Sequence, residues 1–356
     1  MRRFVSLALV VAPVAVAAQG DVSVRTAPQY LGYTLDQSGT KLKVTQLSLP
    51  FGFIKPLTQK LTFDVGTAFA SSTVDDGTTK STLSGFTDTQ VRFNYSVNDF
   101  FIVTAGVNVP TGQYKVAPDK VTAAGQIGND FLAFPVSSYG NGLAGTGGVA
   151  FAQSLGEWNL GVGGSFRKST EFGAFETGTS TLKFQPADEV RARVGLDREI
   201  SGGRVMFGVI YSKFGNDATK DDTVRTTYSS GDRLIGQAGV STGRLYVGGW
   251  LLHHATGQLA CGAGTCASPS ENIANILTEV SVDVGSMTWQ PSLELRGWTR
   301  DNKNAGELAF VGVRTTFGVS GAQVSPSVSY GLGKLKGPPD IDVTGIRAGL
   351  TIRIGQ

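Results

Sequence analysis

The sequence predicts an all-β protein, namely a transmembrane, antiparallel, up-and-down β-barrel of about 16 strands, with 14 as the nearest alternative. Three observations lead to this prediction. Segment after segment alternates apolar and polar side chains, as strands between lipid and a wet interior do. Short and long connections alternate along the chain, as the short periplasmic turns and longer outer loops of such barrels do. No mature segment has the roughly 18 apolar residues that a spanning helix needs.

The clearest strand is the last one, at 345–356. The side chains at its even-numbered positions differ sharply from those at its odd-numbered positions. A helix could not place the two sets on opposite faces, because it would spread both sets around its axis. The first parity is apolar and the second is small, polar or basic: Ile346, Ala348, Leu350, Ile352 and Ile354 against Arg347, Gly349, Thr351 and Arg353.

Residues 1–18 are predicted to be a secretory signal peptide. Arg2 and Arg3 form a basic start, an apolar stretch follows over 4–16, and small residues precede Gln19. Such segments are removed and take no part in the fold. The alternative is an N-terminal membrane anchor, but the apolar stretch is short for one. The remaining residues 19–356 are predicted to form a single barrel in the bacterial outer membrane.

The same pattern predicts the other strands in order. The expected strands are 29–35, 44–53, 61–69, 90–97, 101–109, 148–155, 158–166, 189–197, 205–213, 233–241, 245–252, 276–284, 288–298, 308–317 and 323–332. The expected polar loops include 71–84, 167–187, 215–231, 253–275 and 300–306. Trp158, Trp289 and Trp298 lie near strand ends, where aromatic side chains anchor barrels at the membrane interfaces.

The longest connection, 110–145, is rich in Gly and Pro but also carries apolar residues. An irregular loop of this length is usually functional or disordered, and its apolar content argues against disorder. Phe131, Leu132 and Phe134 are therefore candidates for a constriction or an apolar ligand site inside the barrel. The alternative is a loop that packs over the rim.

Charged residues within the strands share parity with the polar face, as expected if they face the lumen, because Lys or Arg at the lipid mid-plane costs about 2–4 kcal/mol. They either line a passage or pair across the lumen and hold the barrel together, and both signs are present. The candidates are Asp64, Arg92, Arg191, Arg193, Glu279, Asp283, Glu294, Arg296, Arg314, Arg347 and Arg353.

Cys261 and Cys266 lie in a Gly-rich stretch, and in an oxidising compartment a short disulfide is the first expectation. His253 and His254 lie just upstream, but the spacing matches no standard zinc motif. We therefore predict no metal site and no cofactor. A net charge of +3 is too small to indicate nucleic acid binding.

Two short motifs, Ser84-Gly85-Phe86-Thr87-Asp88 and, at the end of the next strand, Val109-Pro110-Thr111-Gly112, resemble those of the outer-membrane transporter family named for the meta-pathway of phenol degradation. Thr87 stands where that family usually has Gly. The resemblance implies a barrel for the uptake of small, often aromatic or hydrophobic compounds. It implies no particular ligand residue.

The leading functional hypothesis is an outer-membrane channel for passive uptake of small solutes, including hydrophobic or aromatic ones. The second is a structural or adhesive barrel without transport. The third, a surface enzyme, has only His253 and His254 as general bases and no nucleophile motif, so we predict no enzyme activity. The expected partners are outer-membrane lipid, a small-molecule solute and, during biogenesis, the barrel-assembly machinery.

Overall fold

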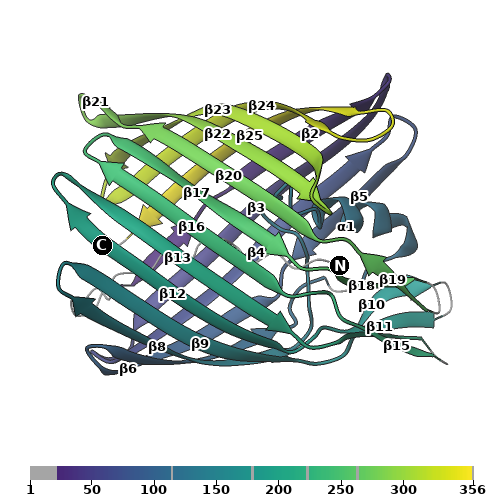
Figure 1. Ribbon diagram of the computed structural model, residues 1–356, viewed down its shortest axis with the longest axis horizontal. Helices are drawn as coiled ribbons and strands as arrows, with labels where there is room; N and C mark the ends of the chain where they lie inside the picture. Colours follow the sequence, from purple (N-terminus) through teal and green to yellow (C-terminus); the bar gives the residue numbers. More distant parts are fainter. Residues whose placement is uncertain (1–21, 114, 178–179, 222–223, 262–263, 355–356) are drawn as a thin grey trace.

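In the computed structural model, the chain forms one closed β-barrel (Figure 1). The structure describes residues 22–356 except 114, 178–179, 222–223, 262–263 and 355–356, so the expected signal peptide lies outside the described residues. The barrel closes because its first strand pairs antiparallel with its last, for example Tyr33 opposite Gly345. Nineteen segments share the sheet, and three wall strands are each split in two, which leaves 16 strands, as predicted.

The wall strands are long and all antiparallel. In order they are β1 (Ser23–Thr26) with β2 (Gln29–Gln37), β3 (Thr40–Pro56), β4 (Leu61–Asp75), β5 (Lys80–Phe86) with β6 (Thr89–Asn98), β7 (Phe101–Val109), β8 (Ala144–Leu155), β9 (Trp158–Ser169), β12 (Glu189–Ile200), β13 (Gly203–Phe214), β16 (Arg233–Thr242), β17 (Leu245–His254), β20 (Glu271–Val280) with β21 (Val282–Val284), β22 (Met287–Arg300), β23 (Lys303–Val319), β24 (Ala322–Leu335) and β25 (Ile341–Ile354).

The remaining elements gather at one end of the barrel, at the right of Figure 1, which we call the long-loop end. They are a 3-10 helix η1 (Pro118–Lys120), a short helix α1 (Val121–Ile127), a small sheet of β10 (Phe172–Thr177), β11 (Ser180–Gln185), β14 (Asp217–Lys220) and β15 (Arg225–Tyr228), and a hairpin of β18 (Gly257–Cys261) and β19 (Gly264–Ser268). The other end, which we call the short-turn end, has only tight connections between wall strands.

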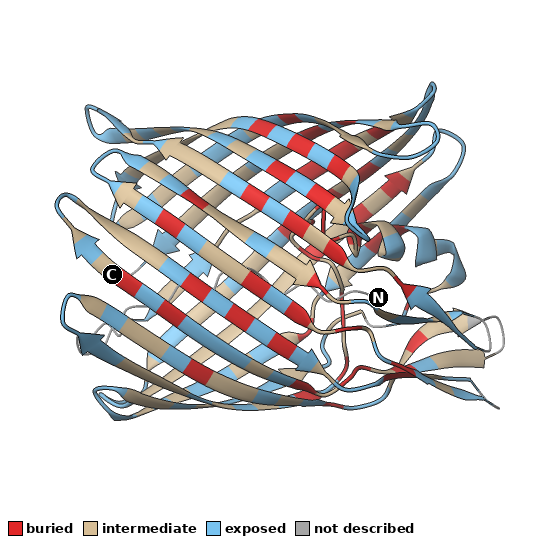
Figure 2. Ribbon diagram, viewed as in Figure 1, coloured by how far each residue is buried: buried red, intermediate tan, exposed pale blue. Residues whose placement is uncertain are grey.

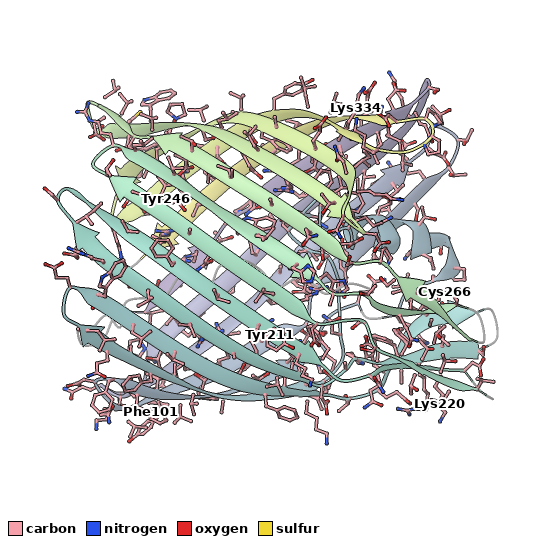
Figure 3. The ribbon with its side chains drawn as sticks, viewed as in Figure 1. Phe101, Tyr211, Lys220, Tyr246, Cys266 and Lys334 are labelled. Atoms are coloured by element: carbon pink, nitrogen blue, oxygen red, sulfur yellow. A yellow bond between two sulfur atoms is a disulfide. The ribbon has the colours of Figure 1, made fainter. Side chains whose placement is uncertain are left out.

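The two faces of the wall follow from residue parity. Large apolar side chains such as Leu47, Phe93, Val107, Leu293 and Ile346 are exposed on the outside. Their neighbours along each strand point inward, which gives the banded burial pattern of Figure 2. Figure 3 shows Phe101 on the outer surface at the short-turn end. An apolar exterior around a polar interior is the arrangement of a barrel in lipid. Among the described residues, no helix is long and apolar enough to cross a membrane.

The predicted alternation of short and long connections has exceptions, because some connections at the long-loop end are short. The predicted loop 71–84 is instead a strand extension, because β4 runs to Asp75 and β5 starts at Lys80. Thr73 and Thr82 face each other there with hydroxyls 3.1 Å apart. The outward side chains here are polar, which hid this pairing, while the apolar ones, Val74 and Leu83, are buried inside. Asp301 and Asn302 likewise form a tight turn within predicted loop 300–306.

The placement of Trp298 at a membrane interface is also wrong. Its strand partner across the ladder, Ile273, is buried in the barrel interior, and Trp298 itself is only 9% exposed. The indole lies on the inward parity of β22, because Leu293 and Leu295 occupy the outward one. The predicted loops 167–187, 215–231 and 253–275 contain the short strands β10, β11, β14, β15, β18 and β19.

Candidate functional site

The connection between β7 and β8 enters the barrel and crosses its lumen. We call residues 110–143 the inner loop. It starts between the fifth and sixth wall strands, and its residue Phe131 stacks on Trp298 of β22, the thirteenth strand, with ring centroids 5.3 Å apart. In a ring of 16, the fifth and thirteenth strands lie on opposite sides. The tip of the inner loop therefore reaches across the lumen to the opposite wall, while η1 and α1 pack against β4 and β5 at the long-loop end.

Both ends of the inner loop are held by one carboxylate. Asp88, between β5 and β6, accepts hydrogen bonds from the backbone N–H of Gly112 (3.1 Å) and of Asn141 (2.6 Å), and from the Asn108 side chain (2.9 Å). Gly112 has no room for a side chain, because a Cβ there would lie 2.0 Å from the carbonyl oxygen of Tyr139. Asp88 thus acts as a latch that holds the two ends of the inner loop.

The middle of the inner loop is held by a buried amide. Gln46 on β3 donates to the carbonyl of Val136 (2.6 Å) and accepts from its N–H (2.8 Å), so one side chain satisfies both backbone groups. Tyr139 donates to the carbonyl of Leu83 (2.8 Å), and its hydroxyl lies 2.9 Å from that of Ser72. Burial raises the pKa of Tyr139 to about 12, so this donor stays protonated at neutral pH.

The far wall holds the tip of the inner loop. Arg296 donates to the carbonyl of Phe131 at 2.6 Å, and Tyr33 donates to that of Leu132 at 2.8 Å. Phe134 meets Tyr33 edge to face, with centroids 5.6 Å apart. Phe131, Leu132 and Phe134 are all at most 1% exposed and belong to one hydrophobic cluster inside the barrel. The inner loop is therefore a packed part of the fold.

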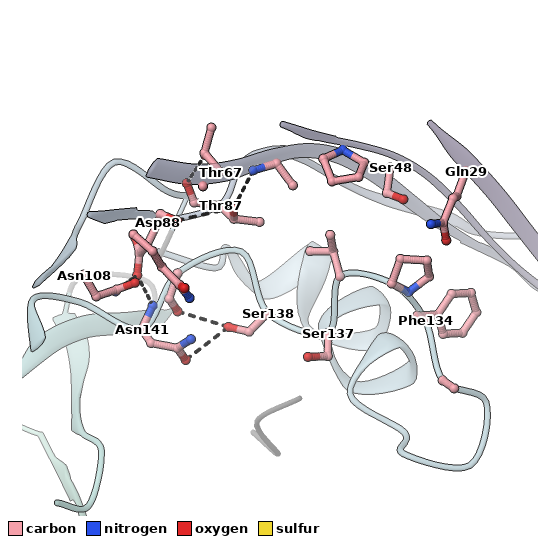
Figure 4. A pocket seen from close by; sticks show the side chains of 18 of the residues that line it. Gln29, Ser48, Thr67, Thr87, Asp88, Asn108, Phe134, Ser137, Ser138 and Asn141 are labelled. Atoms are coloured by element: carbon pink, nitrogen blue, oxygen red, sulfur yellow. Dashed lines mark hydrogen bonds between the residues drawn. The ribbon is translucent and has the colours of Figure 1, made fainter. Parts of the chain in front are cut away.

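The inner loop leaves a cavity of about 650 Å³ between itself and the wall (Figure 4). Phe134 lines this cavity, whereas Phe131 and Leu132 do not. The wall side is partly apolar and comes from strands far apart in sequence, including Ala68, Ile235 and Trp250. Trp250 lies on the inward parity of β17, next to Arg296. A cavity of this size accommodates a small organic molecule.

One polar group in the cavity wall lacks a partner. Ser48 on β3 is 1% exposed, and among the described residues its hydroxyl has no hydrogen-bond partner. Figure 4 shows Ser48 pointing from the strand toward the inner loop. Buried hydroxyls are normally paired, so the enclosed hydroxyl of Ser48 is an exception, and its oxygen has almost no surface open to the cavity.

All eleven charged candidates lie on the inward face by register. Most form ion pairs: Arg92 with Asp64 (2.8 Å), Arg314 with Glu279 (3.1 Å), and both Arg296 and Arg347 with Glu294 (2.6 Å each), while Arg191 pairs with Glu189 (2.7 Å). Asp283 accepts a hydrogen bond from Thr288. Arg193 and Arg353 make no ion pair to a described carboxylate. Pairing across the wall is thus the main role of these charges.

The cysteines and histidines do not line the cavity. Cys261 and Cys266 are bridged, with Cα atoms 5.7 Å apart, in the β18–β19 hairpin at the long-loop end. Figure 3 shows Cys266 in that position. His253 lies 2.8 Å from the Asn272 amide oxygen and faces outward, while His254 faces inward and is buried. Among the described residues, no group of His, Cys, Asp and Glu has the geometry of a metal site.

Sequence reasoning missed the residues that hold the inner loop. Tyr33 and Gln46 lie in strands whose polar parity gave no hint of a specific partner. Asp88 belongs to a motif that was noticed, but its role was not predicted. The signal was the pairing of this motif with the Thr111-Gly112 turn one strand later, since both meet at the same latch.

Neither models of protein families nor curated proteins match this chain. Among solved structures, the mutant monoaromatic hydrocarbon channel TodX is similar at 10% identity and a TM-score of 0.45, over 95% of this chain and 91% of that one. Salmonella typhi OmpF is similar at 10% identity and a TM-score of 0.47, over 94% and 97%. A mutant Rh. blastica porin is similar at 14% identity and a TM-score of 0.40, over 94% and 100%.

Proposed function

We propose that this protein is a bacterial outer-membrane channel through which small solutes pass beside the inner loop without energy input. The observation that carries the proposal is the inner loop itself. It crosses the lumen from wall to wall, yet leaves a cavity of about 650 Å³ against the wall. A barrel that served only as a scaffold would need no such cavity.

The cavity suggests which solutes fit. Phe134, Trp250 and Ile235 offer apolar contact. Polar side chains, among them Asn108 and Arg233, also line the cavity. Pockets that are mainly apolar with a few polar groups bind small molecules that have an apolar body and carry polar groups. We therefore propose small hydrophobic or aromatic solutes that carry a polar group, which agrees with the motif resemblance to the meta-pathway family.

The placement in the cell is part of the same proposal. The short-turn end faces the periplasm and the long-loop end faces outward, as in barrels of the outer membrane. Residues 1–18 direct export across the inner membrane, and the barrel-assembly machinery inserts the mature chain. The apolar side chains on the outside of the barrel wall contact the lipid.

Liposome swelling with neutral sugars of increasing size tests the route. Ala68 lines the cavity on β4, and Ala68→Trp fills the cavity without removing an anchor of the inner loop. We expect this variant to slow pentose entry severalfold. The matched control is Ala105→Trp, whose side chain points outward from β7 into lipid. Equal rates for both variants, or no swelling with the folded wild-type barrel, would contradict the proposal and favour a barrel without transport.

A further inference from the structure

One sector of the lumen wall is lined by small residues. It consists of β7, β8, β9 and β12, and the inner-loop anchors Tyr33, Gln46 and Arg296 lie on other strands. We call it the open wall. The register places its inward residues in adjacent rows across the sheet, and between the arginines described next they are Thr104, Gly106, Thr146, Gly148, Ala150, Gly163 and Ser165. Small side chains here leave room in the lumen.

Four arginines surround the open wall. Arg92 lies opposite Gly106, and its side chain would contact any Cβ placed there, at 3.0 Å. Arg193 lies opposite Gly163 in the same way, with its Nε 2.7 Å from the point that a Cβ on Gly163 would occupy. The glycines thus provide the space in which these side chains lie. Arg167 and Arg191 complete the group on β9 and β12, both on the inward parity.

These four guanidinium groups form ion pairs with only two of the described carboxylates. Arg92 pairs with Asp64, but the Arg92 side chain is 56% exposed while that of Asp64 is 14% exposed, so the positive partner faces the lumen. Arg191 pairs with Glu189, which is buried. Within the described part of the chain, Arg167 and Arg193 have no carboxylate within 4.0 Å. Two of the four guanidinium groups thus lack an ion-pair partner among the described carboxylates, although the carboxylate of Asp88 interacts electrostatically with Arg167.

The opposite wall differs where the inner loop reaches it, because Arg296 and Arg347 are committed to the fold there, whereas Arg353 lies farther away, near the short-turn end of β25. Arg296 is buried and donates both to Glu294 and to the carbonyl of Phe131. Arg347 shares Glu294 and lies over the ring of Phe310. Their donors are used in holding the inner loop and the strands together. In the open wall, by contrast, exposed guanidinium groups lie beside rows of small residues.

We propose that the open wall makes the channel selective for small organic anions, whose carboxylate or similar oxyanion group meets Arg92 and Arg193 in passing. Guanidinium groups recognise planar oxyanions through paired N–H donors. A charge about 5 Å away in water changes the local concentration of a monovalent ion about two- to fourfold, with salt screening reducing the effect. This inference rests on the proposed channel function and adds the charge class of its solutes.

The test is the reversal potential of the refolded mature protein in a planar bilayer under a tenfold KCl gradient. We expect chloride to permeate better than potassium. Arg193→Gln and Arg92→Gln should each lower the chloride-to-potassium permeability ratio about two- to fourfold, and the double variant should lower it further. The control is Arg198→Gln, because Arg198 faces outward and pairs with Glu157 at a turn, so its loss should leave the ratio unchanged.

A second measurement compares benzoate with benzamide, which have the same shape but differ in charge, as solutes for flux into proteoliposomes. Benzoate should enter faster through the wild-type channel, and this preference should fall in the Arg92→Gln, Arg193→Gln double variant. An unselective or cation-selective current, or equal flux of the two solutes, overturns the inference of anion selectivity but not the proposed channel function. No current and no flux through a folded barrel overturns the proposed channel, and this inference with it.

Discussion

If Asp88 holds the ends of the inner loop, replacing one of its carboxylate oxygens by an amide nitrogen should increase the open population of that loop. In Asp88→Asn, an amide nitrogen replaces one carboxylate oxygen and cannot accept a hydrogen bond. The two oxygens together accept from Gly112, Asn141 and Asn108, so at least one of these donors loses its partner. A hydrogen bond to a charged group contributes about 1.5–3 kcal/mol, which corresponds to a roughly 10- to 150-fold increase in the open population of the inner loop.

Hydrogen exchange measured by mass spectrometry reports directly on the open population of the inner loop. Peptides covering 129–141 should exchange faster by that factor in Asp88→Asn, while peptides from β12 and β13 keep the wild-type rate because their ladder is untouched. The control is Asp76→Asn, since Asp76 accepts a similar set of bonds from Thr78 and Thr79 in an outer turn. Unchanged exchange at 129–141 in Asp88→Asn would refute the latch.

Three further experiments probe the same loop and the hairpin beside it. Phe131→Ala removes the stack on Trp298 and leaves a cavity that costs about 3–5 kcal/mol. The inner loop should therefore open, while the unfolding temperature of the barrel, measured by gel shift, stays within a few degrees of the wild-type value. Unfolding of the whole barrel would contradict this prediction. The pKa of Tyr139 is raised from 10.0 to about 12. Its contribution to the stability of inner-loop docking is therefore constant below about pH 10 and declines as the pH rises toward 12. Hydrogen exchange at 129–141 should accelerate over that pH range more in the wild-type protein than in Tyr139→Phe. Reducing the Cys261–Cys266 bridge should speed exchange in the β18–β19 hairpin only, and a change in single-channel conductance would show that the hairpin reaches the lumen.

The barrel could be predicted from sequence because its determinants are local. Alternation along a strand such as 345–356 reports directly on which face meets lipid, and 16 such segments fix the strand number. Strand ends above the membrane were not predictable in the same way. Around Thr73 and Thr82 the outward side chains are polar and the buried Val74 and Leu83 point inward, so the apolar-outward pattern of a lipid-facing strand is lost although the ladder continues.

The candidate site depended on contacts that join distant parts of the chain. Gln46 and Val136 are 90 positions apart, and Arg296 and Phe131 are 165 apart. Sequence reasoning identified apolar residues in 110–145 but left open whether they enter the barrel. That choice depends on buried partners on the far wall, such as Trp298, which the pattern had placed at the membrane interface.

The most direct test of the central claim is the single-channel conductance of the refolded mature protein before and after removal of the inner loop. Residues 117–136 are replaced by a short Gly-Ser linker, which leaves the Asp88 latch and the wall strands in place. We predict small, stable current steps from the wild-type protein and clearly larger steps from the shortened variant. Equal steps from both proteins, or no current from a folded wild-type barrel that conducts only after the deletion, would contradict a channel whose solutes pass beside this loop.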